Sequence, residues 1–192
     1  RKRAIAATHG LSADVPWVVT VAMMRRDAKL ASYRLLAESL GRAEQPCQLL
    51  LIGDGKARAE IESLFSGELE KRTRFLGMLG HADTLATLSA CDLFVWPAVN
   101  EAIGMALLEA QACGLPVVAG SSGAIAEIVD NGQTGLLYPP DCSQEMAKGI
   151  DRLLSDEALR ARFSDQARLD TLKKHSLSAA ATRLDAIFSG LC

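Results

Sequence analysis

Two glutamates lie eight positions apart in the apolar stretch from Asn100 to Gly120. Glu101 opens the stretch and Glu109 lies inside it. This spacing is roughly two turns of an α-helix, so both carboxylates can face one cleft. A carboxylate beside a phosphate would repel it, so the natural target of Glu101 is a neutral hydroxyl group. An unpaired Glu109 in an apolar segment would be costly, and a pair of vicinal ribose hydroxyls is one suitable partner.

Free backbone amides are expected beside Glu101. The pattern predicts a helix over Glu101–Cys113, ended by a glycine. The amides from Ile103 to Ala106 lack intrahelical partners at such a helix start. Together with the helix dipole they form an anion site, which Gly104 lets a ligand approach closely. The simpler alternative is that Glu101 caps the helix and Glu109 pairs with a surface cation.

The elements that must position these residues alternate between strand and helix. Short apolar runs that do not alternate with polar residues are typical of strands buried on both faces of a parallel sheet. The sequence therefore predicts an α/β fold: a Rossmann-like, doubly wound parallel sheet of about six strands with C-terminal helices. The predicted strands are Trp17–Ala22, Cys47–Gly53, Arg72–Gly77, Asp92–Pro97, Leu115–Gly120 and Thr134–Pro140.

Polar and glycine-rich segments follow these strands. They read "MMRRDAK", "GDGK", "GMLGH" and "AVNEAIG" after the first four. Sheets of this type bind ligands at the carboxyl ends of their strands, so these loops should converge on one crevice. "GDGK" lacks the full phosphate-loop form, and we interpret Gly53–Lys56 as a tight strand-to-helix turn.

The stretch from Glu101 to Val118 resembles the Glu-x7-Glu signature of glycosyltransferase family 4, retaining enzymes of the GT-B fold. The family form is Glu-x-Phe-Gly, four residues, a second Glu, then Ala-x-Ala-x-Gly-x-Pro-Val-Val. Ile103 stands where Phe is usual. "SSGAIAEIV" and "NGQTGLLYPP" resemble two further family motifs, and the likeness runs from about Val18 to the C-terminus. The matched positions of the signature are Glu101, Gly104, Glu109, Ala110, Ala112, Gly114, Pro116, Val117 and Val118.

The resemblance implies roles for these positions. Glu109 would hold the ribose hydroxyls of the donor, and Glu101, the catalytic candidate, would meet the transferred sugar. From these roles we expect loss of Glu101 to spare the free nucleoside diphosphate and to weaken the nucleotide sugar. The Gly53–Lys56 turn would line the pocket for the base. Backbone groups after the third strand would read the base, and those after the fourth would meet the sugar and diphosphate. These two sets are Gly77, Met78 and Leu79, and Ala102, Ile103, Gly104, Met105 and Ala106.

The cationic loop is the weakest part of the match. The family places an Arg just after the first strand and a Lys a few residues on, and both clamp the diphosphate. Here Met23 stands where that Arg is usual, Lys29 fits the Lys, and Arg25 or Arg26 would supply the guanidinium. Fixed cations stabilise the growing charge of a departing diphosphate, and Arg can bind it in bidentate fashion. A solvated basic loop is the alternative for all three cations.

Composition narrows the class of function. The chain has 192 residues and a net charge of -2, which gives no electrostatic footprint for nucleic acid. Its five cysteines show no C-x-x-C spacing and its three histidines no metal-ligand spacing. We therefore predict no metal and no cofactor, with a nucleoside-diphosphate sugar as donor substrate. No apolar run reaches ~18 residues and no signal peptide is visible, so no transmembrane helix is expected.

A single nucleotide-sugar-binding domain is expected over residues 1–192. Residues 1–15 would be a tail from an interdomain linker, 16–175 the Rossmann-like core and 176–192 a terminal helix. The start without Met indicates a fragment, and about 15 residues before the first strand are too few for another domain. The N-terminal acceptor domain of a GT-B enzyme, which usually carries a catalytic-site histidine, would therefore be absent and the fragment inactive alone.

We accordingly predict the donor-binding domain of a retaining glycosyltransferase, which transfers a sugar from a nucleoside-diphosphate sugar to a hydroxyl acceptor. Two alternatives stay open: a nucleotide-sugar epimerase of GT-B architecture, and a non-catalytic nucleotide-binding or scaffold domain. The expected partners are the nucleotide sugar and the absent domain of the same polypeptide. The free thiols fit a reducing cytoplasm, where the full-length protein would be either free or peripheral to a membrane.

Overall fold

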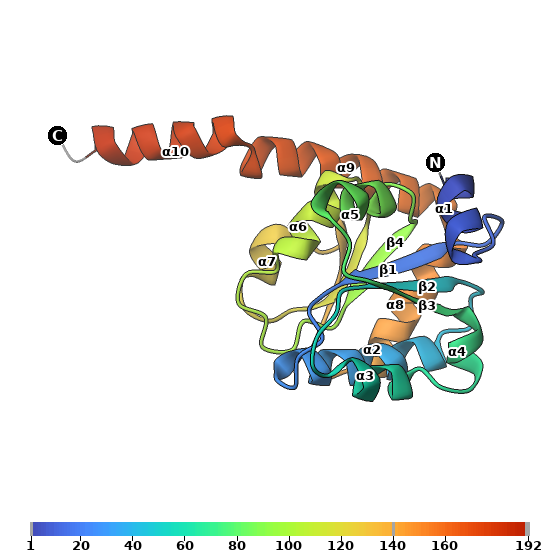
Figure 1. Cartoon of the computed structure of the whole chain (residues 1–192). Helices are drawn as coiled ribbons and strands as arrows, with labels where there is room; N and C mark the ends of the chain where they lie inside the picture. The colour runs from blue at the N-terminus through green and yellow to red at the C-terminus, as the bar shows by residue number, and fades with distance from the viewer. Residues whose placement is uncertain (1, 140, 191–192) are drawn as a thin grey trace.

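Six parallel strands form one sheet in the computed structural model, which describes residues 2–139 and 141–190 (Figure 1). The order across the sheet is β3-β2-β1-β4-β5-β6. The prediction of a Rossmann-like, doubly wound parallel sheet is therefore confirmed. The strands are β1 (Trp17–Val21), β2 (Gln48–Ile52), β3 (Thr73–Gly77), β4 (Leu93–Trp96), β5 (Val117–Gly120) and β6 (Gly135–Tyr138).

Helices cover both faces of the sheet. In Figure 1, α2, α3 and α4 lie below it, and α5, α6 and α9 lie above it. The helices are α1 (Lys2–His9), α2 (Ala28–Arg42), α3 (Arg58–Leu64), α4 (Glu68–Arg72), α5 (His81–Leu88), α6 (Met105–Ala112), α7 (Ile125–Ile128), α8 (Ser143–Ser155), α9 (Glu157–His175) and α10 (Leu177–Ser189). This two-sided cover explains why the strands read as continuous apolar runs, since both of their faces are buried.

The topological switch point lies between β1 and β4. These strands are neighbours, with Val18 opposite Leu93 and Val19 opposite Phe94, and the buried hydroxyl of Thr20 donates to the carbonyl oxygen of Val95. The chain leaves β1 toward β2 and leaves β4 toward β5. The two connections therefore diverge at the carboxyl ends of β1 and β4, which leaves a crevice where ligands bind in such sheets.

The helix predicted over Glu101–Cys113 was placed too early at its N-terminal end, because α6 begins at Met105. Ala98 and Asn100 have positive φ angles of 55° and 50°, and Gly104, the N-cap, has φ 75°. A right-handed helix cannot pass through residues in this region. Glu101 therefore lies in the loop that joins β4 to α6, rather than on the helix itself.

The two ends of the chain differ in how they pack. Within residues 1–15, predicted as a tail, helix α1 buries Ala6, and Lys2 forms an ion pair with Asp92 at 2.7 Å. Within 176–192, predicted as a terminal helix, α10 projects beyond the end of α9 and has no buried residue (Figure 1). Residue 140, which ends the last predicted strand, and residues 191–192 lie outside the described residues.

Because α10 buries no residue, we predict that deleting residues 177–192 lowers the free energy of unfolding by less than about 1 kcal/mol. The melting temperature should accordingly fall by less than about 4 °C. Thermal unfolding followed by circular dichroism measures this. Phe163→Ala in α9 is the positive control, because Phe163 is 1% exposed and its loss should cost about 3–5 kcal/mol. A truncated chain that melts as early as this control would contradict the prediction.

Candidate functional site

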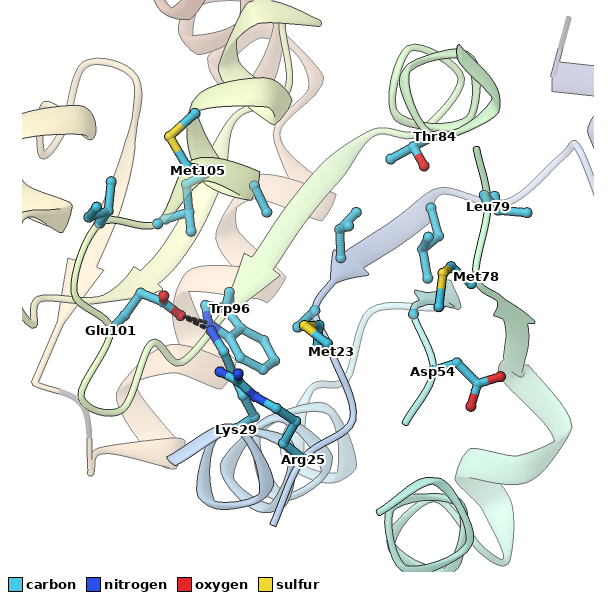
Figure 2. Close-up of a pocket in the computed structure, with 18 of the residues that line it drawn as sticks. Met23, Arg25, Lys29, Asp54, Met78, Leu79, Thr84, Trp96, Glu101 and Met105 are labelled. Carbon is cyan, nitrogen blue, oxygen red and sulfur yellow. Dashed lines mark hydrogen bonds and ion pairs between the residues drawn. The ribbon is translucent and has the colours of Figure 1, made fainter. Parts of the chain in front are cut away.

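A cavity of about 600 Å³ opens at the carboxyl ends of β1, β2 and β4 (Figure 2). It lies at the topological switch point, where the fold predicts a ligand. Its volume is within the range of small-molecule sites. The lining residues come from five segments: Val21, Ala22, Met23, Arg25 and Lys29; Ile52, Gly53 and Asp54; Met78 and Leu79; Thr84; and Trp96 with Glu101 to Leu107.

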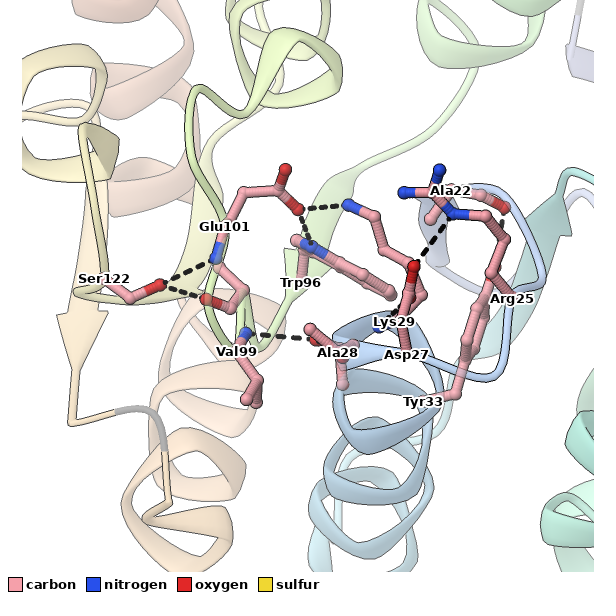
Figure 3. A network of polar contacts seen from close by, with 12 residues as sticks. Ala22, Arg25, Asp27, Ala28, Lys29, Tyr33, Trp96, Val99, Glu101 and Ser122 are labelled. Atoms are coloured by element: carbon pink, nitrogen blue, oxygen red, sulfur yellow. Dashed lines mark hydrogen bonds and ion pairs between the residues drawn. The ribbon is translucent and has the colours of Figure 1, made fainter.

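Lys29 and Glu101 form an ion pair across the cavity. The ammonium group of Lys29 donates to Oε2 of Glu101, and Nε1 of Trp96 donates to the same oxygen at 3.1 Å (Figure 3). The Lys29 ammonium also lies 5.4 Å from the centroid of the Trp96 ring. The two charged side chains are only 19% and 16% exposed, so the pair is shielded from solvent far more than a surface pair.

The loop that carries Glu101 is fixed by hydrogen bonds from two sides. The amide of Glu101 donates to Oγ of Ser122 at 3.3 Å, and that hydroxyl in turn donates to the carbonyl oxygen of Ala98 (Figure 3). On the other side, the amide of Val99 donates to Oγ of Ser32 in α2 at 3.0 Å. The loop contacts of Ser122 and Ser32 hold the carboxylate at the cavity before any ligand arrives.

The backbone at Gly123 packs closely against the backbone of the Glu101 loop. Gly123 has φ 56°, and a Cβ atom there would lie 2.0 Å from the carbonyl oxygen of Glu101. No residue other than glycine fits this position without moving the loop. The SSG sequence after β5 is therefore a support for the Glu101 loop.

The loop that carries Lys29 is held by the start of α2. Asp27 caps this helix and accepts from the amide of Lys29 at 2.9 Å, and its other oxygen lies 3.1 Å from Nε of Arg25. Tyr33, one turn further on, donates to the carbonyl oxygen of Ala22 at 2.8 Å. Burial raises the pKa of Tyr33 well above its usual range, so the phenol keeps the proton that this bond requires.

Backbone amides at the start of α6 are available to a ligand. Among the described residues, no hydrogen bond is found for the amides of Ala102 to Ala106, whereas the amide of Leu107 donates to the carbonyl oxygen of Gly104 at 2.9 Å. The unpaired N–H groups lie at the positive end of the helix dipole and line the cavity. This arrangement can bind an anion.

The cavity brings together most of the predicted site residues. These are Arg25, Lys29, Gly53, Met78, Leu79, Glu101, Ala102, Ile103, Gly104, Met105 and Ala106. Three predicted residues do not line it. Arg26 is 73% exposed and lies 3.5 Å from Glu60, and Gly77 accepts through its carbonyl oxygen from the amide of Gly53. Glu109 is 33% exposed, with Oε1 4.0 Å from Nδ1 of His81.

Trp96, in the predicted strand Asp92–Pro97, lines the cavity although the sequence analysis gave it no role there, whereas Asp54 belongs to the Gly53–Lys56 turn that was expected to line the base pocket. Trp96 is buried, yet its indole N–H faces the cavity and donates to Glu101. The sequence held one signal for this contact: a buried indole N–H needs a hydrogen-bond acceptor, and Glu101 follows five positions later. Asp54 accepts from the amide of Gly55, which, together with Arg58, lowers the pKa of its carboxyl group. Asp54 is therefore an anion on the β2 side of the cavity.

No group of three or more potential metal ligands occurs in residues 2–139 and 141–190. The cations and the backbone amides are thus the positive groups that these residues present to the cavity. In the same part of the chain, no helix is both long enough and apolar enough to span a bilayer.

Comparison with known proteins identifies relatives. The profile of the family described as "Glycosyl transferases group 1" matches residues 2–170. An alpha-D-kanosaminyltransferase from Streptomyces kanamyceticus is 31% identical over 189 residues, 98% of this chain and 49% of its own length. A D-inositol 3-phosphate glycosyltransferase from Corynebacterium aurimucosum is 35% identical over 63% of this chain and 28% of its own length. The chain thus spans half or less of these relatives.

Solved structures give the same fold. A sucrose-phosphate synthase from Thermosynechococcus elongatus matches with a TM-score of 0.83 at 29% identity, over 97% of this chain and 48% of that protein. The Anabaena protein HepE, solved in complex with UDP and glucose, matches with a TM-score of 0.84 at 23% identity, over 98% of this chain and 52% of that protein. At 23% sequence identity, the similarity to HepE supports a shared fold and nothing more.

Proposed function

The chain belongs to the group 1 glycosyl transferase family, and from this premise we propose that it is the donor-binding half of a retaining glycosyltransferase of family 4. The parent protein would transfer a sugar from a nucleoside-diphosphate sugar to a hydroxyl acceptor. The named relatives are glycosyltransferases, and this finding does not favour the alternative that the parent is a nucleotide-sugar epimerase. We also propose that the parent is cytoplasmic, either free or peripheral to a membrane, which the free thiols of Cys47, Cys91, Cys113 and Cys142 support because they fit a reducing compartment.

One observation carries this proposal: a single cavity combines cations and unpaired amides with a shielded carboxylate. Lys29, Arg25 and the amides of Ala102 to Ala106 suit an anion, whereas Glu101 would repel one. A ligand that satisfies both must join a diphosphate to a group that donates hydrogen bonds. A nucleoside diphosphate carrying a sugar has this composition, with the phosphates toward the amides and a sugar hydroxyl toward Glu101.

The remaining lining residues suit the nucleoside. Met78 and Leu79 follow β3, and Gly53 and Asp54 follow β2. Figure 2 shows Met78, Leu79 and Asp54 on the side of the cavity away from Glu101. Apolar side chains beside a few polar groups are typical of small-molecule sites. We assign this side to the base. Glu109 stays the proposed ribose ligand, although its carboxylate lies outside the cavity lining and beside His81.

The chemical role of the cations follows from where charge develops. When the bond between sugar and diphosphate breaks, negative charge grows on the phosphate oxygens. Lys29, Arg25 and the α6 amides would stabilise that charge in a partly enclosed site, where fixed donors act more strongly than in water. Because these groups are in place already, we propose that no metal ion is needed and that the site holds no cofactor.

The ion pair between Lys29 and Glu101 sets a condition on binding. In the structure the ammonium group is engaged by the carboxylate, so a diphosphate that recruits Lys29 must share it with Glu101 or replace that contact. This changes the expectation from the sequence that loss of Glu101 would spare the free diphosphate. Removing the negative charge should instead strengthen binding of the diphosphate.

The first test is calorimetric titration with uridine, guanosine and adenosine diphosphates, each in EDTA and in Mg²⁺. We expect one of them to bind at about micromolar to millimolar affinity, with the same affinity in both buffers. Equal affinities would mean that residues of this chain bind the diphosphate without the help of a metal ion. Binding that requires Mg²⁺ would contradict the metal-free site, and failure of the full-length protein to bind any of the three would contradict the donor-binding function.

We predict that Glu101→Gln binds the free diphosphate more tightly, by about 0.5–1.5 kcal/mol, because Lys29 loses a charged partner and the site loses a repulsive charge. The advantage that the corresponding nucleotide sugar has over the diphosphate should shrink in the same variant. Parallel titrations measure both. Glu157→Gln, at the exposed first turn of α9, is the matched control, and a diphosphate affinity for Glu101→Gln equal to this control would refute the competition for Lys29.

Glu109→Ala should weaken binding of the diphosphate by about 1–3 kcal/mol, the cost of losing a charged hydrogen-bond partner of the ribose. The loss should be equal for the diphosphate and its sugar conjugate, since both contain the ribose. Titration of both ligands measures it, with Glu157→Ala as control. Unchanged affinity would remove Glu109 from the site and leave it as the partner of His81 only.

A further inference from the structure

We propose that Trp96 is a positioning residue, which fixes Glu101 for the sugar of the donor through its indole N–H. This inference rests on the proposed function and deepens it. It also goes beyond it, because the family signature that surrounds Glu101 begins after Trp96 and assigns it nothing. The argument starts from how the two oxygens of Glu101 are used.

Two donors converge on one oxygen of Glu101. Oε2 accepts from Nζ of Lys29 and, at 3.1 Å, from Nε1 of Trp96. For Oε1, no hydrogen bond is found among the described residues. A carboxylate held at one oxygen cannot turn freely, so its second oxygen keeps a fixed direction. Oε1 is therefore the oxygen left to accept from a ligand hydroxyl.

Trp96 is itself held firmly. It is the last residue of β4 and is 2% exposed. Its ring meets the ring of Tyr33 edge-on, with centroids 5.2 Å apart and an interplanar angle of 77°. Tyr33 is tied to the end of β1 through its bond to the carbonyl oxygen of Ala22. Figure 3 shows the side chains of Lys29 and Trp96 meeting at the carboxylate of Glu101.

The two donors to Oε2 differ in what a ligand does to them. Lys29 carries a full charge on a flexible stem, so a bound diphosphate will draw its ammonium group away. Trp96 is neutral and buried, so the same ligand leaves its N–H in place. Once Lys29 turns to the phosphates, the indole N–H is the contact that keeps Glu101 oriented toward the sugar. Trp96 should therefore matter to the sugar-bearing ligand and little to the free diphosphate.

The first arm of the test needs no ligand. Protein labelled with ¹⁵N on the indole groups has two indole N–H signals in an NMR spectrum, from Trp96 and Trp17. The Trp17 indole donates to the carbonyl oxygen of Ser12 at 2.7 Å, far from the cavity, and serves as internal reference. We expect Glu101→Gln to shift the Trp96 signal and to leave the Trp17 signal unchanged. A Trp96 signal that does not move would overturn the proposal.

The second arm compares ligands in the variant Trp96→Phe, which keeps an aromatic ring but removes the N–H. The probes are UDP with UDP-glucose, GDP with GDP-mannose and ADP with ADP-glucose. For the pair that the wild-type protein binds, we expect Kd of the sugar conjugate to rise about threefold to tenfold and Kd of the diphosphate to change less than about twofold. Trp17→Phe, which also removes the indole hydrogen bond of a buried tryptophan, should leave both values unchanged.

A double variant separates positioning from general loosening of the site. If Trp96 acts through Glu101, then adding Trp96→Phe to Glu101→Gln should cause no further loss of the sugar conjugate. Equal losses on both ligands, or full additivity in the double variant, would overturn the role of Trp96 while leaving the donor-binding function intact. A full-length protein that binds none of the six probes would overturn the donor-binding function, and the positioning role with it. The NMR arm does not depend on whether Trp96→Phe folds.

Discussion

The contact between Lys29 and Glu101 depends on the one constraint that builds the site: β1 and β4 are neighbours at the centre of the sheet. Their residues lie more than 70 positions apart in the chain, and only the parallel pairing of these strands brings their following loops together. The hydroxyl of Thr20 bonded to Val95 strengthens the pairing beneath the site. Every group that faces the cavity from these two loops therefore depends on the register of a single strand pair.

The electrostatics of the site are local. The chain has a net charge of -2, so its field does not draw anions in from a distance. Positive potential is concentrated where Lys29, Arg25 and the first amides of α6 meet, and the Glu101 carboxylate lies within the same cavity. Opposite charges in contact orient each other before a ligand binds. A ligand then meets groups that are already in place, which reduces the reorganisation needed on binding.

The sheet was predictable because most of its strands are short apolar runs without polar alternation, which are typical of a parallel sheet covered on both faces. The crevice followed from the same rule, since parallel strands place their following loops at one edge. The start of α6 was not predictable, because Ala98 and Asn100 take left-handed angles that only the packing around them enforces. The angle costs about 1–2 kcal/mol at Ala98 and less at Asn100, because asparagine tolerates this region, and the bonds of Ser122 and Ser32 to this loop offset that strain.

Trp96 and Glu109 both show that a sequence pattern does not give the direction in which a side chain points. An apolar pattern correctly puts Trp96 inside the protein, but hydropathy does not say where its single polar atom points. The Glu-x7-Glu spacing assumes one straight helix from the first glutamate to the second. Because the helix begins only at Met105, Glu101 lies on the preceding loop and Glu109 on the helix, with Oε1 of Glu109 4.0 Å from Nδ1 of His81. Pattern fixes which face of a regular element a residue takes; it does not fix a side chain beside an irregular loop.

Large apolar side chains around the cavity explain how affinity can arise without a strong global field. Met23, Met78, Ile103 and Met105 all line the cavity and are each more than half exposed. Fully covering one side chain of this size contributes about 1.5–3 kcal/mol, and exposed apolar groups gathered at one place are typical of binding surfaces. Methionine adapts its shape to the ring or chain that covers it. The apolar residues and the charged residues therefore act on different parts of one ligand, so only a molecule that carries both an anionic group and a ring system gains from both.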